Sequence, residues 1–220
     1  MRASLLRRCC MLLIAAACAL SLPAQQPRAS RPAPRPSAPA AAKLGPGEYA
    51  TFVTGKGTFV AQLYPEQAPK AVANFVALAE GTQPFVDPST GGLSRSKFYN
   101  GLLFFRSVPG QFIQTGDQLN NGTGTLGYTL PFEKNNLKFD RAGRMALAQS
   151  PGDATSRNSQ IFFTLRALPA FDSQGFLIIG QIVRGLDVAT ALAAGPRRRG
   201  AEDQPLYPNI LRSVTIQQVH

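Results

Sequence analysis

The stretch Phe104–Asp117 reads FFRSVPGQFIQTGD, and the fold of the 220-residue chain can be worked out from it. Two apolar runs, Leu102–Phe105 and Phe112–Ile113, flank a Val-Pro-Gly bend, a pattern that predicts strand, turn and strand. One arginine, Arg106, and one glutamine, Gln114, stand in this apolar setting. Because an unpaired arginine is rarely buried, Arg106 either lies at a sheet edge with its head group in water or points into a pocket.

A second stretch, Ser159–Leu165, reads SQIFFTL and predicts another strand with a polar pair at its entrance. Together the two stretches resemble the cyclophilin family of peptidyl-prolyl isomerases. The family signature F-[HF]-R-x-[IV]-P-G-F-x-x-Q-G-G-D stands here as FFRSVPGQFIQTGD, and GSQFFI stands as NSQIFFTL. The resemblance covers residues 49–219 and continues through four further matches: Phe132-Glu133, Met145–Gln149, Phe171-Asp172 and Ile179-Gly180.

The order of apolar segments predicts a mainly β protein. Many short strands with two helices suggest an antiparallel β-barrel. The resemblance sharpens this to a closed eight-stranded antiparallel β-barrel capped by two α-helices. In such a cyclophilin-like domain the interior is packed solid, so the site is expected on an outer face.

The first elements of the domain have clear local signals. Residues 49–53 and 58–64 are joined by Gly55-Lys56-Gly57, which indicates a hairpin. Pro69 suits the first turn of a helix that runs to Glu80 and ends at Gly81. Val72, Phe75, Val76 and Ala79 follow the helical period, so they are expected to form its buried stripe.

Later elements are expected at the ranges 144–149, 161–165, 176–183 and 210–218 for strands and 186–194 for a helix. Residues 82–101 are interpreted as a surface loop, and Tyr128–Phe132 as strand-like. The glycines Gly122, Gly124 and Gly127 match G-x-G-x-x-G, but no helix is expected after them. A dinucleotide site is therefore rejected, and the resemblance places this loop at the rim of a substrate groove.

The net charge of +11 is unevenly distributed along the chain. Residues 1–43 contain seven Lys or Arg and no acid, which leaves 16 basic and 12 acidic residues, a net charge of +4, for the remainder. The run Arg197-Arg198-Arg199 is interpreted as a solvated loop. Nucleic acid is not an expected partner of this mildly basic domain.

The first 24 residues have the features of an export signal peptide: a basic start, an apolar run from Met11 to Leu22, and a small residue at Ala24. Cleavage after Ala24 is expected, with lipidation at Cys18 as the alternative, which would tie the protein to a membrane. All three cysteines lie in this leader. A mature chain without the lipid would have no disulfide.

Residues 25–43 form a Pro/Ala/Arg-rich segment containing RPAPRPSAPAAA. Too few apolar side chains are present to offset chain entropy, so a disordered linker is expected, with a basic arm on an anionic surface as the alternative. Residues 44–220 then form the isomerase domain. The leader indicates an exported, periplasmic protein, and we expect a monomer.

The sequence excludes several kinds of catalysis. His220 is the only histidine, so a Ser-His-Asp or Cys-His arrangement cannot be built. No cluster of His, Cys and carboxylates suggests a metal site. No cofactor is implied. Rotation of an X-Pro bond needs no nucleophile, base or metal, and it fits this restriction.

The resemblance also assigns roles by position. Arg106 falls at the family's catalytic arginine, and Gln114 at the glutamine that holds this arginine and contacts the substrate. The other matched positions form the proline pocket and hold the substrate backbone: Phe112, Phe162 and Phe171 for the pocket, and Ala148, Gln149 and Gln160 for the backbone. Proline-containing segments of unfolded or folding proteins are the expected partners.

Several positions depart from the family pattern, among them four at or beside the expected site. Gln111 replaces a pocket phenylalanine, Gln149 an asparagine, Thr115 a glycine, and Phe176 a histidine of the site. These changes leave a second hypothesis open: a cyclophilin-fold module or holdase chaperone that binds Pro-containing segments with little turnover. A third hypothesis, a basic surface-anchoring protein, depends on the linker alone.

Overall fold

The computed structural model describes residues 43–131, 133–148 and 158–220. The predicted leader, the linker up to residue 42, Phe132 and Gln149 lie outside these ranges. Within the ranges no helix is long and apolar enough to cross a membrane.

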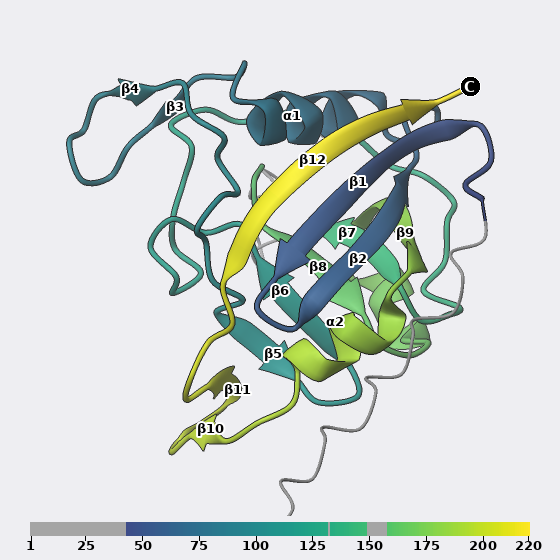
Figure 1. The fold of residues 1–220 in the computed structure, drawn as a ribbon, viewed down its shortest axis with the longest axis vertical. Helices are drawn as coiled ribbons and strands as arrows, with labels where there is room; N and C mark the ends of the chain where they lie inside the picture. The colour runs from purple at the N-terminus through teal and green to yellow at the C-terminus, as the bar shows by residue number, and fades with distance from the viewer. Residues whose placement is uncertain (1–42, 132, 149–157) are drawn as a thin grey trace, which may run out of the picture. The chain divides into compact units, whose positions relative to one another are not determined.

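Eight strands form one antiparallel sheet, in the order β12-β1-β2-β9-β7-β8-β6-β5 (Figure 1). Their bounds are Gly47–Thr54 (β1), Gly57–Leu63 (β2), Arg106–Val108 (β5), Phe112–Thr115 (β6), Arg144–Leu147 (β7), Ile161–Thr164 (β8), Leu177–Arg184 (β9) and Leu211–Val219 (β12). The predicted hairpin of β1 and β2 is confirmed, with Thr54 paired to Gly57 across its turn.

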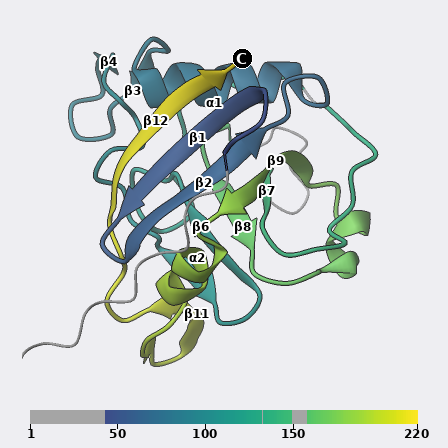
Figure 2. The same ribbon diagram turned by 45° about the vertical axis from the view of Figure 1, so that its right-hand side comes forward.

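The sheet curls until its two ends approach each other, as the views in Figures 1 and 2 agree. An isolated bridge joins Leu103 to Ile210, just ahead of the edge strands β5 and β12. Phe104 donates its backbone N–H to Asn209, and Leu211 donates to Leu102. The predicted mainly β, eight-stranded architecture is confirmed, in the form of a curled half-barrel.

Helix α1 spans Pro69–Glu80, as predicted from its sequence signals. It ends at Gly81, whose φ of 80° is a left-handed conformation that favours glycine. The predicted stripe lies inward, except that Val76 is only partly buried. The first turn has no acidic residue of its own, and Glu133 accepts hydrogen bonds from the N–H groups of Lys70 and Ala71 instead.

Helix α2, Leu186–Leu192, contacts β2, whereas α1 contacts β12. The two helices lie at opposite ends of the curled sheet (Figure 2). The remaining elements are short: β3 at Phe85–Val86, β4 at Leu93–Ser94, a 3-10 helix at Pro169–Ser173, β10 at Arg197–Arg198 and β11 at Ala201–Pro205.

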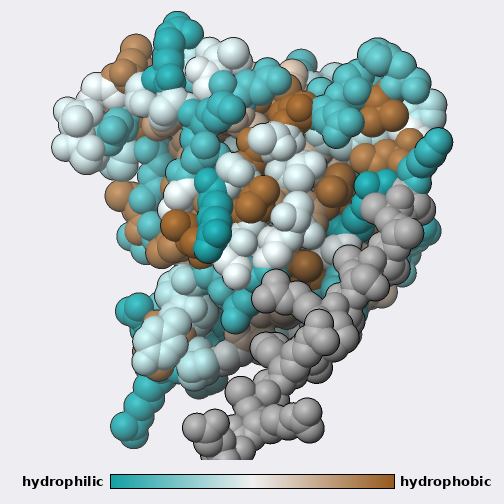
Figure 3. Space-filling view, in the orientation of Figure 1, coloured by the Kyte–Doolittle hydropathy of each residue, from teal (hydrophilic) through white to brown (hydrophobic). Residues whose placement is uncertain are grey.

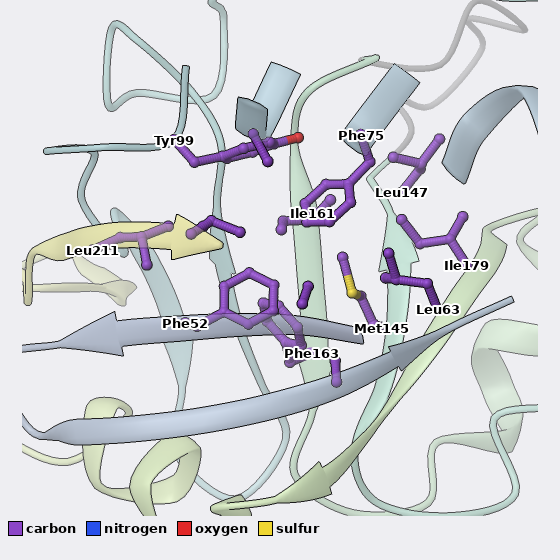
Figure 4. Close-up of a cluster of buried hydrophobic side chains, with 14 of the residues drawn as sticks. Phe52, Leu63, Phe75, Tyr99, Met145, Leu147, Ile161, Phe163, Ile179 and Leu211 are labelled. Atoms are coloured by element: carbon purple, nitrogen blue, oxygen red, sulfur yellow. The ribbon is translucent and has the colours of Figure 1, made fainter. Parts of the chain in front are cut away.

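The core fills the inside of the curled sheet (Figure 4). The rings of Phe52 and Phe59 stack at 4.7 Å, and Phe163 meets both edge-on at 5.1 Å. Phe75 from α1 covers this group, 6.2 Å from Phe52. Full burial of aromatic rings in these geometries contributes more than area alone, so this cluster is expected to dominate stability.

The face formed by β12, β1 and β2 mixes apolar and polar side chains (Figure 3). Burial along β1 is uneven: Tyr49, Ala50, Phe52 and Thr54 are buried, whereas the residues between them are partly exposed. This pattern is expected for a sheet with one face packed on the core.

Four local predictions were wrong. The apolar run Leu102–Phe105 precedes the strand, which begins at Arg106. Residues 128–131 are not a strand, and residues 82–101 contain the small β3–β4 pair. The run Arg197-Arg198-Arg199 is not wholly a solvated loop, because Arg197 is partly buried in β10 and donates to the Ser107 hydroxyl at 2.7 Å.

Candidate active site

Strand pairing brings the two signature stretches together. In the register of β5 and β6, Arg106 lies opposite Gln114. In the register of β6 and β8, Gln114 lies opposite Phe162. Directly paired residues point to the same face of a sheet, so these three side chains share one face. That face carries its own apolar cluster, separate from the core inside the curled sheet.

A chain of side-chain hydrogen bonds runs across this face. Gln160 donates from Nε2 to the carbonyl oxygen of Gly122 at 3.2 Å. Gln114 donates from Nε2 to Oε1 of Gln160 at 3.0 Å, and Arg106 donates from Nη1 to Oε1 of Gln114 at 3.4 Å. Each amide therefore uses both its donor and its acceptor, which fixes the way its oxygen points.

Arg106 has two further contacts. Its Nε donates to Oδ2 of Asp203 at 2.6 Å, and its guanidinium carbon lies 5.0 Å from the centre of the Phe112 ring. The arginine side chain remains 44% exposed. A cation over an aromatic face is attracted by the ring quadrupole, so Phe112 helps to orient the guanidinium.

Five phenylalanines belong to the apolar cluster on this face: Phe112, Phe139, Phe162, Phe171 and Phe176. Phe162 lies among the others, with ring centres 5.0 Å from Phe176 and 5.8 Å from both Phe139 and Phe171. Phe139 is almost fully buried, and its ring stacks on that of Phe162 at an interplanar angle of 16°. The sequence prediction did not include Phe139.

The buried Asp117, at the end of the signature stretch, organises the loop that follows it. Its carboxylate accepts from the backbone N–H groups of Leu119, Asn121 and Gly122. A Cβ at Gly124 would collide with this carboxylate, so only glycine fits there. The loop thereby presents the Gly122 carbonyl to Gln160.

These groups surround a pocket of about 280 Å³. Eight of the ten predicted site residues line it: Arg106, Phe112, Gln114, Ala148, Gln160, Phe162, Phe171 and Phe176. Gln149 lies outside the described residues. Gln111 is not part of the described lining; it occupies the β5–β6 turn, where its N–H donates to Val108 and its carbonyl accepts from Leu165.

Five further residues line the pocket without having been predicted as substrate-binding or catalytic: Phe105, Asn121, Gly122, Asp203 and Gln204. Gly122 was expected at a groove rim, and Phe105 and Asn121 are neighbours of predicted residues. Asp203 and Gln204 come from β11, some 97 residues from Arg106. No local sequence pattern connects these distant segments, so their place at the site could not be predicted.

The pocket combines an apolar wall with a single fixed cation. Arg106 and Asp203 are the charged members of the described lining. Among the described residues no group of three His, Cys, Asp or Glu is placed to hold a metal ion. The described side chains can therefore bind an apolar ring, donate hydrogen bonds and impose an electric field.

Comparison with protein families gives a match over residues 49–216 to the model described as cyclophilin type peptidyl-prolyl cis-trans isomerase/CLD. The chain is 36% identical over 173 residues to peptidyl-prolyl cis-trans isomerase B of Streptomyces anulatus, covering 77% of this chain and 96% of that protein. It is 32% identical over 169 residues to peptidyl-prolyl cis-trans isomerase A of Mycobacterium tuberculosis, covering 76% and 91%.

Among solved structures, the chain is similar to a cyclophilin type peptidyl-prolyl cis-trans isomerase of Cryptosporidium parvum, studied in the presence of the dipeptide Ala-Pro. The TM-score is 0.63 at 25% identity, covering 78% of this chain and 99% of the other.

Proposed function

This chain belongs to the cyclophilin-type peptidyl-prolyl cis-trans isomerase family, and we propose that its pocket rotates X-Pro bonds through a hydrogen bond from Arg106 to the twisted prolyl amide. The activity follows from the family match and from relatives that share nearly their whole length with the chain. The observation that carries the mechanism is the guanidinium of Arg106, held by Gln114 at the edge of an aromatic pocket.

The barrier that must be lowered is the resonance of the peptide bond, about 18–20 kcal/mol. In the twisted transition state this resonance is lost, and the prolyl nitrogen becomes pyramidal with a usable lone pair. The guanidinium of Arg106 donates a hydrogen bond to that nitrogen. The planar ground state has no such lone pair, so the interaction stabilises the transition state selectively.

The phenylalanine wall receives the proline ring. Phe112, Phe162 and Phe171 all line the pocket, and the centres of their rings lie about 6 Å from one another. A ring held there cannot follow the rotation, so the residue before proline moves instead. Ala148 and Gln160 hold the substrate backbone, together with Gln149.

The glutamine chain keeps Arg106 oriented between turnovers. Gln160 and Gln114 are both buried, and the chain ends on a backbone carbonyl that cannot rotate freely. Electrostatic stabilisation is strongest when its donors are fixed before the reaction begins.

The proposed setting is protein folding after export. Uncatalysed X-Pro isomerisation takes tens to hundreds of seconds, slow enough to limit the folding of exported chains. The support is the sequence of residues 1–24, with its basic start and apolar run. Expression of the full chain in a Gram-negative host, followed by cell fractionation and N-terminal sequencing, tests this setting. A mature periplasmic chain beginning at Gln25 is expected, and an unprocessed cytoplasmic chain would contradict it.

Action on folding chains is tested with a disulfide-free protein whose slow refolding phase is limited by prolyl isomerisation. The full chain should shorten this phase at concentrations well below that of the refolding protein, whereas Arg106→Ala should not. A holdase would instead reduce aggregation without changing the rate of the slow phase. That result, with equal effects of both chains, would contradict catalysis.

A further inference from the structure

Arg106 has a partner outside the signature motif. The carboxylate of Asp203, in β11, accepts the hydrogen bond of Arg106 Nε at 2.6 Å, shorter than the 3.4 Å contact between Arg106 and Gln114. Within the described part of the chain, Asp203 is the residue that forms an ion pair with Arg106. Both bonds have the charged guanidinium as donor, but only Asp203 adds a charged acceptor and the shorter distance, so Asp203 is the firmer of the two contacts.

The hairpin that carries Asp203 is anchored to the strand that carries Arg106. Arg197, at the start of the β10–β11 hairpin, donates to the hydroxyl of Ser107, the residue that follows Arg106. Its other terminal nitrogen donates to the carbonyl of Ala193, after α2. Leu206 donates to the carbonyl of Pro196, which closes the base of the hairpin.

The exit of the hairpin is fixed as well. Residues 209–211 pair with residues 102–104, directly ahead of Arg106, through the backbone bonds that bring the sheet edges together. Asp203 therefore lies in a segment that is attached at both ends: Arg197 bonds to Ser107, just after Arg106, and residues 209–211 bond to residues 102–104, just before it. These attachments hold Asp203 in a defined position relative to β5. Its contact with Arg106 is therefore a consequence of the fold.

The two contacts divide the donors of the guanidinium. Asp203 takes Nε, and Gln114 takes Nη1. Within the described residues, no hydrogen bond occupies Nη2. Because the guanidinium is planar and rigid, fixing two of its three nitrogens fixes the direction of the third.

We propose that Asp203 is a positioning residue that, together with Gln114, aims the free Nη2 amine of Arg106 at the prolyl bond. This inference rests on the proposed function. An arginine side chain otherwise samples many rotamers, and ordering it before the substrate arrives removes that cost from the reaction. Both partners are well exposed, at 44% and 39%, so the pair contributes little to folding and its effect falls on turnover.

Three variants of the full chain separate this role from general effects of charge. Asp203→Ala removes the acceptor, and Asp203→Asn keeps its shape but removes the charge. Glu202→Gln is the matched control, because Glu202 is the exposed neighbour on β11 and loses the same charge. In exchange NMR with a short Ala-Pro peptide, Asp203→Ala should lower the on-enzyme rate about fivefold and Asp203→Asn about two- to threefold. The peptide Kd should change less, and Glu202→Gln should match wild type.

A second readout does not depend on turnover. The Arg106 Nε–Hε signal, assigned by its loss in Arg106→Lys, should exchange slowly with water in wild type and in Glu202→Gln. It should exchange faster in both Asp203 variants. Urea midpoints equal to wild type would show that the hairpin remains folded.

The two proposals fail in different ways. A wild-type chain that binds the peptide without accelerating its isomerisation contradicts the proposed function. The role of Asp203 is overturned if wild type is active and Asp203→Ala is equally active, or if the Nε–Hε signal of wild type exchanges as fast as that of the variants.

Discussion

Three polar side chains at the site depend on one another. Gln160 is fully buried, and its amide links the Gly122 carbonyl to Gln114 by one hydrogen bond to each. Removing one member leaves the next with an unmade bond in a buried place, which costs about 1–3 kcal/mol. The orientation of Arg106 is thus coupled to a loop more than ten residues away in sequence.

Gln160→Leu should therefore weaken catalysis without removing the arginine. The variant leaves Gln114 Nε2 without its acceptor, so Arg106 becomes less well oriented. We expect a roughly tenfold lower isomerisation rate, together with a loss of about 1–3 kcal/mol in the free energy of unfolding. Exchange NMR and urea unfolding measure these effects. Gln217→Leu, at an exposed position on β12, is the control, and equal rates for both variants would contradict the coupling.

Sequence-based prediction identified most of the residues that line the site, but it missed those that come from distant segments. Arg106, Gln114 and Phe162 were predicted because they lie in contiguous strand motifs, whose pairing puts them on one face. Gln111, assigned to the site by position, lies in the β5–β6 turn and is not part of the described lining. Asp203 was missed because an exposed acid in a distant hairpin has no local signal.

The elements around the site depend on contacts that are distant in sequence. Helix α1 begins without a side-chain cap, and Glu133 supplies one from 63 and 62 residues away through both carboxylate oxygens. A negative charge at this end also complements the helix dipole. The segment that contains Glu133 is therefore attached to α1.

Glu133→Gln should destabilise the protein by about 1 kcal/mol at neutral pH. An amide offers one oxygen where the carboxylate offers two, so its NH₂ group would face one of the two backbone N–H groups. Urea unfolding measures the difference, with Glu202→Gln as a control for removing an exposed charge. Equal midpoints for Glu133→Gln and Glu202→Gln would show that the cap contributes nothing.

Gly116→Ala tests the packing of β6 against the entrance of β8. Gly116 has a φ of 89°, and a Cβ there would collide with the backbone carbonyl of Ser159, next to Gln160. The backbone must shift, so we expect a loss of about 2 kcal/mol or more together with lower activity. Gly110→Ala is the matched control: its φ is 68°, but no atom lies within 4 Å of the added Cβ. Equal melting temperatures for Gly116→Ala and Gly110→Ala would contradict this account.

Prediction of the elements succeeded where a local signal decides the structure. The glycine turn before β2 and the Pro69 and Gly81 boundaries of α1 are such signals. The errors at residues 102–105 and 128–131 have one cause. An apolar run predicts burial, but a strand also needs a continuous ladder with a neighbour, and how far that ladder extends is not written in the segment: Leu103, for example, forms only an isolated bridge to Ile210.

On the scale of the whole molecule, the curled sheet separates stability from chemistry. Its inner face packs Phe52, Phe59 and Phe163, whereas its outer face carries the phenylalanines of the pocket. Phe162 and Phe163 are neighbours in β8 and point to opposite faces, because side chains alternate along a strand. One two-residue motif thus contributes to both the core and the site.

The stability of the molecule should depend on pH through Asp140. Hydrogen bonds from Arg141 and from the nearly buried Arg144 hold the pKa of the Asp140 carboxyl well below its usual value of 3.8. A depressed pKa in the folded state gives stability that is present above the usual value and is lost as the pH falls toward the folded-state value. Wild type should therefore exceed Asp140→Asn in stability at pH 7, and the difference should shrink below pH 3.8. Urea titrations at several pH values test this, and a constant difference would contradict it.

The central claim is that Arg106 stabilises the twisted prolyl bond, and one paired measurement tests it most directly. Exchange NMR on a short Ala-Pro peptide gives both the on-enzyme isomerisation rate and the peptide Kd, for the full chain and for Arg106→Ala. We expect the acceleration to fall by at least about a hundredfold in the variant while Kd changes by less than about tenfold. Acceleration that survives the loss of Arg106, or that is lost only in proportion to peptide binding, would contradict the account.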